Sequence, residues 1–126
     1  MHPDQAAFLR DHYLAMGEDE ARATRRVLAA VPEDQGGYAP HPASRTALDL
    51  AWHIASSQVW FYVGVAEGAF PEEDGARPEA IRTPADVLAW YDANRPPAAA
   101  RLKALTGEQL CRPLDEIGRA SCRERV

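Results

Sequence analysis

Histidine is the residue of this chain best suited to bind a metal ion or to transfer a proton near neutral pH. The chain has four of them, His2, His12, His41 and His53. No two are three or four residues apart, the spacing at which two imidazoles leave one face of a helix and meet at one ion. His2 lies at the start of the chain, His41 lies between two prolines, and His12 could face the core or the solvent. We expect none of these three to take part in chemistry.

His53 differs because it lies in the middle of the most apolar segment, next to Trp52 and ahead of Ser56, Ser57 and Trp60. We expect this segment to be a central helix and His53 to be buried. A buried imidazole needs a partner for each ring nitrogen, either a hydrogen-bonding group or a metal ion. Spacing alone favours a hydrogen-bonded core histidine over a metal ligand.

Other reactive side chains form weaker patterns. Glu20 and Thr24 lie one helical turn apart and could support a metal ligand or act as an acid or base. A solvated Glu20 and a Thr24 bonded to its own backbone are commoner. Cys111 has no neighbouring His or Lys, so we expect a small buried thiol, not a nucleophile. The sequence has neither a glycine-rich phosphate loop nor a Gly-x-Ser-x-Gly motif, so nothing supports nucleotide binding or serine hydrolase chemistry.

Hydrophobic periodicity predicts three long helices and no strand, and therefore an all-α domain. The first helix begins at residue 3 or 4 and continues to 31, because Pro32 cannot extend it. A loop rich in Pro and Gly follows, over residues 32–44. The second helix begins at Ser44 or Thr46 and continues to about residue 68.

The third helix has the clearest start, with Thr83 as its cap and Pro84 at its first position. We expect the Pro-Pro pair at 96–97 to kink or interrupt this helix. Thr106 and Gln109 have the spacing of a capping box for a last short turn. Three amphipathic helices leave the second one under-covered, whereas a fourth helix would close an antiparallel up-and-down bundle.

Residues 116–126 match, along their whole length, the in-frame translation of a common sequencing-adapter oligonucleotide. A segment of that origin is set aside before the fold is considered. We therefore expect one domain over residues 1–115, interrupted before its natural end, and a non-native segment over 116–126. The competing interpretation is a genuine basic tail that carries Cys122.

The chain is acidic, with 19 Asp and Glu against 14 Lys and Arg and a formal net charge of −5. Phosphate backbones and anionic membranes attract clustered Lys and Arg, and the nearest approach to a cluster, at residues 22–26, directly follows three acidic residues. We expect no binding to nucleic acid or to membranes. The longest apolar run, 59–66, is far shorter than the ~20 residues that cross a bilayer. Cys111 alone cannot form an internal disulfide, so we expect a cytoplasmic protein.

Several motifs recur in an order and spacing typical of one family. They are residues 21–28, 31–34, 38–42, 44–45 and 105–114, the run Leu50-Ala51-Trp52-His53-Ile54-Ala55, and the run Thr83-Pro84-Ala85-Asp86-Val87-Leu88. Together they resemble the DinB/YfiT-like superfamily of metal-binding four-helix bundles, and the likeness covers essentially all of residues 8–115. The chain resembles such a bundle with its last helix missing.

The resemblance implies a divalent metal, often nickel or zinc, bound by three histidines. One comes from the second helix, at the position of His53, and two come from a His-x-x-x-His pair on the last helix. The chain departs from the family at that pair, because residues 116–126 stand in its place. Three neutral imidazoles would hold such a cation and leave one position open for water or a thiol.

Relatives include thiol-dependent transferases and isomerases. The resemblance therefore implies that the complete protein is an enzyme acting on a small molecule, either as a transferase or isomerase that uses a low-molecular-weight thiol or as a hydrolase. This chain by itself is expected to be inactive and to bind no metal at a defined site. The alternative is a non-catalytic bundle that binds a ligand or partner and keeps His53 as a core residue. A homodimer is compatible with the sequence, and no motif determines it.

Overall fold

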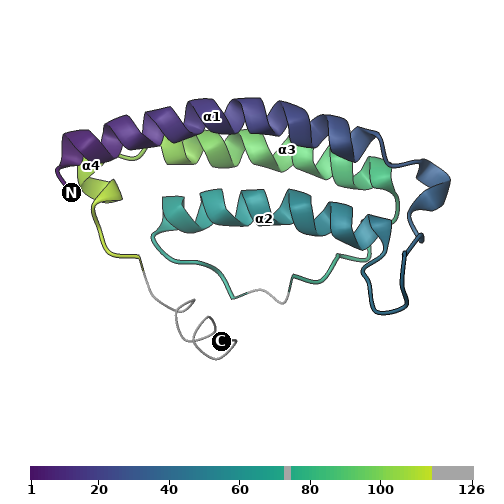
Figure 1. The fold of residues 1–126 in the computed structure, drawn as a ribbon. Helices are drawn as coiled ribbons and strands as arrows, with labels where there is room; N and C mark the ends of the chain where they lie inside the picture. Colours follow the sequence, from purple (N-terminus) through teal and green to yellow (C-terminus); the bar gives the residue numbers. More distant parts are fainter. Residues whose placement is uncertain (73–74, 115–126) are drawn as a thin grey trace.

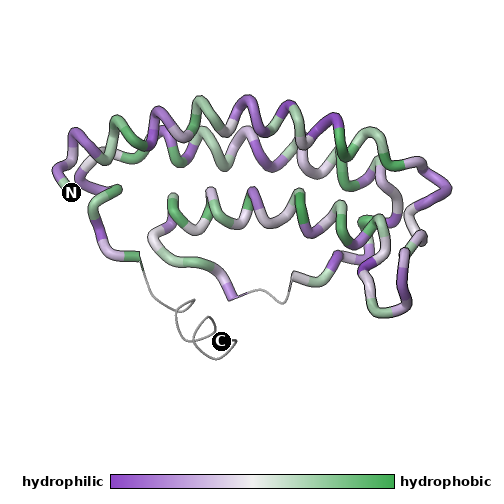
Figure 2. Tube along the Cα trace, in the orientation of Figure 1, coloured by the Kyte–Doolittle hydropathy of each residue, from purple (hydrophilic) through white to green (hydrophobic). Residues whose placement is uncertain are grey.

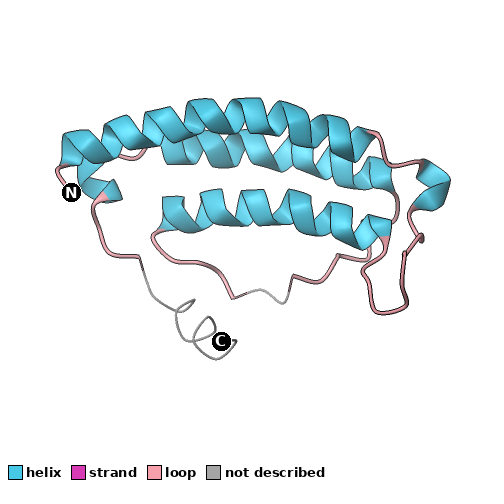
Figure 3. Ribbon diagram, in the orientation of Figure 1, coloured by secondary structure: helices cyan, strands magenta, loops and turns pink. Residues whose placement is uncertain are grey.

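The computed structural model describes residues 1–72 and 75–114 of the 126-residue chain. The segment 116–126 lies outside the described residues, so its interpretation as adapter sequence stays a prediction, as does the end of the domain at residue 115. The described elements are α1 (Pro3–Ala29), a 3-10 turn (Glu33–Gln35), α2 (Ala47–Glu67), α3 (Pro84–Lys103) and α4 (Gly107–Leu110). No β-strand is among them, which confirms the all-α class (Figure 3).

The helices begin where local capping chemistry predicts. The Thr46 hydroxyl accepts a hydrogen bond from the Asp49 backbone N–H and caps α2. Complete capping boxes, with Thr83 and Thr106 as the caps, open α3 and α4. Such a cap satisfies backbone donors that have no partner inside the helix. Gly68 ends α2 at φ 81°, a left-handed conformation that residues with a side chain rarely adopt.

Helices α2 and α3 run parallel, so the expected up-and-down order is wrong for this pair (Figure 1). Near the first turn of α2, Arg77 of the connection that leads into α3 bonds Asp49. At the opposite end of both helices, Arg101 of α3 bonds Glu67 of α2. The physical reason is the connection of residues 68–83, which is longer than the roughly 2–8 residues that join antiparallel neighbours and returns the chain to the starting end of α2.

The Pro-Pro pair does not interrupt α3, which is one continuous helix across Pro96 and Pro97. A proline leaves the carbonyl four residues earlier without its helical donor. Here those carbonyls belong to Asp92 and Ala93, which are exposed. Water can therefore replace the missing donors, and the helix continues.

The core lies where α3 packs against α2, and α3 also packs against α1. Its central side chains are Trp52 and Ala55 from α2 and Val87 and Tyr91 from α3, with Leu28 from α1. Figure 2 shows that α1 carries many hydrophilic bands, whereas α2 is mostly apolar. A helix as apolar as α2 needs cover on more of its circumference than α1 does.

An aromatic cluster fastens the connection after α2 to the end of that helix. The Phe70 ring stacks on Trp60 with a centroid distance of 4.5 Å, and the Trp60 indole N–H donates to the Pro71 carbonyl at 3.0 Å. Phe70 lies directly against Gly64, so closely that a Cβ at this position would overlap its ring. Glycine at 64 therefore makes room for the ring that directs the chain back along the bundle.

Gly64→Ala is expected to destabilise the fold by up to about 2 kcal/mol, because the overlap with Phe70, at about 1–3 kcal/mol, outweighs the roughly 1 kcal/mol that alanine adds inside a helix. Urea denaturation followed by circular dichroism measures the difference. Gly37→Ala is the matched control, since no atom lies within 4 Å of its Cβ position. Equal stability of the Gly64→Ala variant and the wild type would show that Phe70 is not held against this site.

Candidate functional site

His53 is exposed on the first half of α2, so the expectation that it is buried is wrong. The core takes the side of α2 that carries Leu48, Trp52 and Ala55, and His53 follows Trp52 by about 100° around the helix axis. The imidazole instead lines a surface cleft of about 330 Å³. Its walls come from α2, from Arg45 just before it, and from residues 75–77 of the connection. His53 is therefore accessible to a ligand, and its imidazole forms no hydrogen bond or ion pair with the described residues.

An ion pair forms one side of this cleft. The Arg77 Nε–H donates to an Asp49 carboxylate oxygen at 2.7 Å, and Arg77 also donates to the Ile81 carbonyl. Asp49 lies one helical turn before His53, so both side chains are on the same side of α2. The bond from Arg77 holds the pKa of Asp49 below its ordinary value, against the opposing effect of partial burial. A charged Asp49 thus ties the connection to the helix beside His53.

A second cleft, of about 630 Å³, adjoins the first at Trp52 and has Ser56, Pro78 and Trp90 among its walls. The Trp52 and Trp90 rings meet edge to face at a centroid distance of 4.6 Å. The Trp52 indole N–H is buried and finds no hydrogen-bond partner within residues 1–72 and 75–114. Aromatic walls with a few polar groups are typical of small-molecule sites.

The described residues do not complete a metal site. Among them, no group of three or more His, Cys, Asp or Glu side chains is placed to hold one ion. His53 supplies one imidazole, and its acidic neighbour Asp49 is already bonded to Arg77. Zinc and nickel sites in proteins usually take three or four protein ligands. This part of the chain offers a partial donor set.

The other candidate residues lie away from His53. Glu20 is exposed, as the commoner interpretation expects. The Thr24 hydroxyl accepts a hydrogen bond from the Gln58 side chain at 3.0 Å and so joins α1 to α2. Cys111 is exposed, so the expectation of a buried thiol is wrong. It follows the four-residue helix α4, and its thiol donates a hydrogen bond to the Met1 carbonyl at 3.3 Å.

The remaining histidines act locally. The Nδ1 atom of His2 accepts from the backbone N–H of Asp4 and caps α1. The Nδ1 atom of His41 accepts from the Ala43 backbone N–H. His12 is exposed beside Tyr13. The expectation that these three histidines have no chemical role stays untested.

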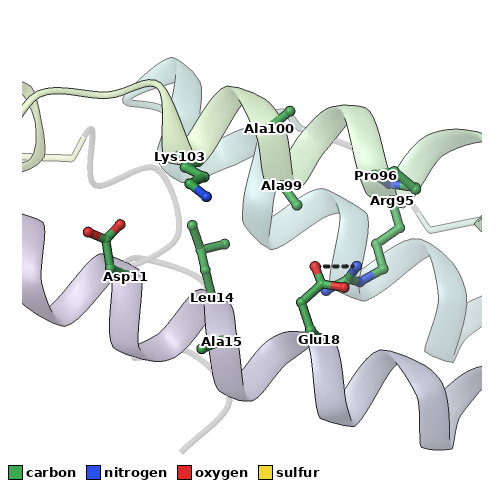
Figure 4. A pocket seen from close by; sticks show the side chains of 9 residues that line it. All are labelled: Asp11, Leu14, Ala15, Glu18, Arg95, Pro96, Ala99, Ala100 and Lys103. Atoms are coloured by element: carbon green, nitrogen blue, oxygen red, sulfur yellow. Dashed lines mark hydrogen bonds and ion pairs between the residues drawn. The ribbon is translucent and has the colours of Figure 1, made fainter.

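A third hollow, of about 600 Å³, lies between α1 and α3 (Figure 4). At one end the buried Arg95 bonds the Glu18 carboxylate at 3.1 Å and the Gly17 carbonyl at 3.0 Å. Its guanidinium also lies over the Tyr62 ring. Burial lowers the pKa of Arg95, but the bond and the charge of Glu18 outweigh it, so the pKa stands above its ordinary value. Through these contacts Arg95 joins α3 to α1 and α2.

Asp49, Arg77 and Arg95 were not singled out as site or core residues from the sequence. Asp49 was recognisable only as part of a helix cap, and its pairing with Arg77 depends on the returning connection. An arginine directly before two prolines gives no signal that it is buried. The one available signal was the spacing of Asp49 and His53. Residues four apart on a helix lie on the same face, so Asp49 could have been expected near the imidazole.

The fold and the accessible imidazole define an all-helical protein with a cleft beside its second helix. The family model of the DinB superfamily matches residues 17–123. The chain therefore belongs to the DinB superfamily. The matched range extends past residue 115. Neither the curated proteins nor the solved structures contain a match to this chain.

None of the described helices combines the length and the apolar character that crossing a bilayer requires.

Asp49→Asn is expected to lower stability near neutral pH, because it removes the charge that Arg77 meets. The ordinary pKa of Asp is about 3.9, and the folded pKa is lower. The stabilisation is therefore complete above about pH 5 and is lost as the pH falls through the folded pKa. The pair is partly exposed, so the effect should not exceed about 1 kcal/mol.

Urea denaturation at a series of pH values measures this effect. The difference between wild type and Asp49→Asn should vanish at the acid end. Asp34→Asn, an exposed aspartate outside this ion pair, is the control. A difference that persists unchanged to the lowest pH would contradict the electrostatic explanation.

Glu18→Ala is expected to cost more stability than Arg95→Met. The first change leaves a buried guanidinium without its counter-charge, at roughly 1–2 kcal/mol, whereas the second leaves a carboxylate that water can reach. Thermal unfolding of both variants, with Lys103→Met in the same hollow as control, provides the comparison. The reverse order would mean that Arg95 contributes mainly through its own contacts.

Proposed function

We propose that the complete protein is a divalent-metal-dependent enzyme of the DinB superfamily and that His53 is one of its metal ligands. The observation that carries this proposal is the exposure of His53 on α2, in a cleft, with no core partner. The metal would be nickel or zinc, which imidazole ligands suit. Further ligands would come from outside the described residues, as the family resemblance implies.

The metal would supply a Lewis acid that lowers the pKa of a bound water or thiol. This chain's own residues would prepare the surroundings. The Asp49–Arg77 pair holds the connection beside His53, and Trp52 and Trp90 offer an apolar surface next to it. These features favour a small-molecule substrate, with a low-molecular-weight thiol as a candidate cosubstrate and transfer or hydrolysis as the reaction.

The alternative function is a bundle without catalysis that binds a ligand or partner and keeps His53 as a core residue. Among the described residues His53 is exposed on α2, which favours the role of a metal ligand over that of a core residue. The adjoining clefts at Trp52 would still serve a protein that binds a ligand without catalysis.

Isothermal titration of nickel or zinc into this chain and into the protein completed with its own genomic sequence tests the proposal. The chain alone is expected to bind weakly and without a defined stoichiometry. The completed protein is expected to bind one ion tightly, and His53→Ala should weaken that binding at least roughly 10–100-fold, since a ligand is lost. His12→Ala, an exposed histidine on α1, is the matched control.

Tight stoichiometric binding by the chain alone would overturn the view that its donor set is incomplete. Unchanged affinity in the completed His53→Ala protein would remove His53 from the metal site. The reaction of a thiol with an electrophile would be assayed on the completed, metal-loaded protein, because this chain by itself is expected to be inactive.

A further inference from the structure

The larger of the two clefts at Trp52, of about 630 Å³, has two tryptophan rings among its walls, here called the tryptophan corner. The Trp52 ring of α2 and the Trp90 ring of α3 meet at 65° between their planes, with a centroid distance of 4.6 Å. Two rings inclined in this way turn their π faces toward one space. Trp52 belongs to the core, whereas Trp90 is only partly buried. The tryptophan corner therefore reaches the surface at the cleft.

The charge of this cleft is negative. Glu72 is exposed and is the one charged side chain among the described walls. In the sequence it opens a run of three acidic residues, 72–74. The π face of an aromatic ring also carries partial negative charge. A carboxylate beside two such rings attracts a cation and repels an anion.

The arginines of the adjoining His53 cleft oppose a bound cation only weakly. Arg77 is paired with Asp49 at 2.7 Å. Arg45 comes seven residues before Trp52, which is about two helical turns or roughly 10 Å along the axis. That distance is about one Debye length at physiological salt, so solvent ions screen much of the Arg45 charge at the tryptophan corner.

We propose that this cleft binds a small organic ammonium ion, with the ammonium group at the tryptophan corner and beside the Glu72 carboxylate. A cation within about 6 Å of an aromatic centroid is attracted by the ring, and tryptophan attracts it most strongly. The Trp52 indole N–H is buried and finds no acceptor in the described part of the chain. A ligand that carries an oxygen next to its ammonium group would supply one, so the chemistry fits a small amine with an oxygen acceptor.

This ammonium site is separate from the proposed metal site. None of its residues is a proposed metal ligand, and its cleft only adjoins the His53 cleft, at Trp52. For the complete protein the site would identify the substrate as an amine whose charged end lies beside the metal-binding cleft, and that extension rests on the proposed function. Binding of an ammonium ion to this chain does not.

Choline titrated into this chain, without metal, tests the proposal. The matched probe is dimethylbutanol, the uncharged isostere in which carbon replaces the ammonium nitrogen. In proton–nitrogen NMR spectra the indole signals of Trp52 and Trp90 are expected to shift and saturate, with choline binding at least about threefold tighter than the alcohol. The Trp60 indole is the internal reference, because it already donates to the Pro71 carbonyl at 3.0 Å.

Glu72→Gln should weaken choline binding at least about threefold and leave binding of the alcohol unchanged, because only the charged probe meets the carboxylate. Glu79→Gln, an exposed glutamate that is not among the cleft walls, is the matched control. Equal affinity for the two probes, choline binding that Glu72→Gln leaves unchanged, or no shift with choline would each overturn the proposal. These outcomes do not depend on whether His53 binds a metal.

Discussion

Two hydrogen bonds at mid-length tie the three long helices together. The Tyr91 hydroxyl of α3 donates to the Gln58 side chain of α2 at 2.7 Å, and Gln58 donates to the Thr24 hydroxyl of α1 at 3.0 Å. Burial raises the pKa of Tyr91, which keeps its hydroxyl protonated as a donor. Sliding any one helix would leave buried polar groups without partners, at about 1–3 kcal/mol each. This chain of bonds therefore sets the register of the bundle.

The register explains how distant segments reach the same cleft. With α2 and α3 parallel, the connection between them must return to the starting end of α2, and it is fastened at both ends. At its beginning, the Phe70 ring stacks on Trp60 of α2. Further along, Arg77 forms an ion pair with Asp49 of α2. The wall opposite His53 is thus formed by a segment more than twenty residues away in sequence. A change at Gly64 or Arg77 would reach the site through this connection.

Membership of the DinB superfamily and the exposed His53 are compatible with one account of function, in which α2 contributes one ligand to a site completed elsewhere. The same helix leaves the Leu50 and Phe61 side chains exposed, at 48% and 56%. Arg95, by contrast, serves the packing of α1 against α3.

The sequence by itself determined the helices and their ends, because caps such as Thr46, Thr83 and Thr106 act within a few residues. The same local information led to the all-α class and singled out His53 as the histidine of interest. Only the tertiary structure decided that α2 and α3 are parallel, that Arg95 is buried and that His53 is exposed. Helix α2 is apolar around much of its circumference, so its pattern leaves its rotation about its own axis open. That rotation was set by the packing of Trp52 and Ala55 against α3 and by the hydrogen bonds through Gln58, which join residues far apart in the chain.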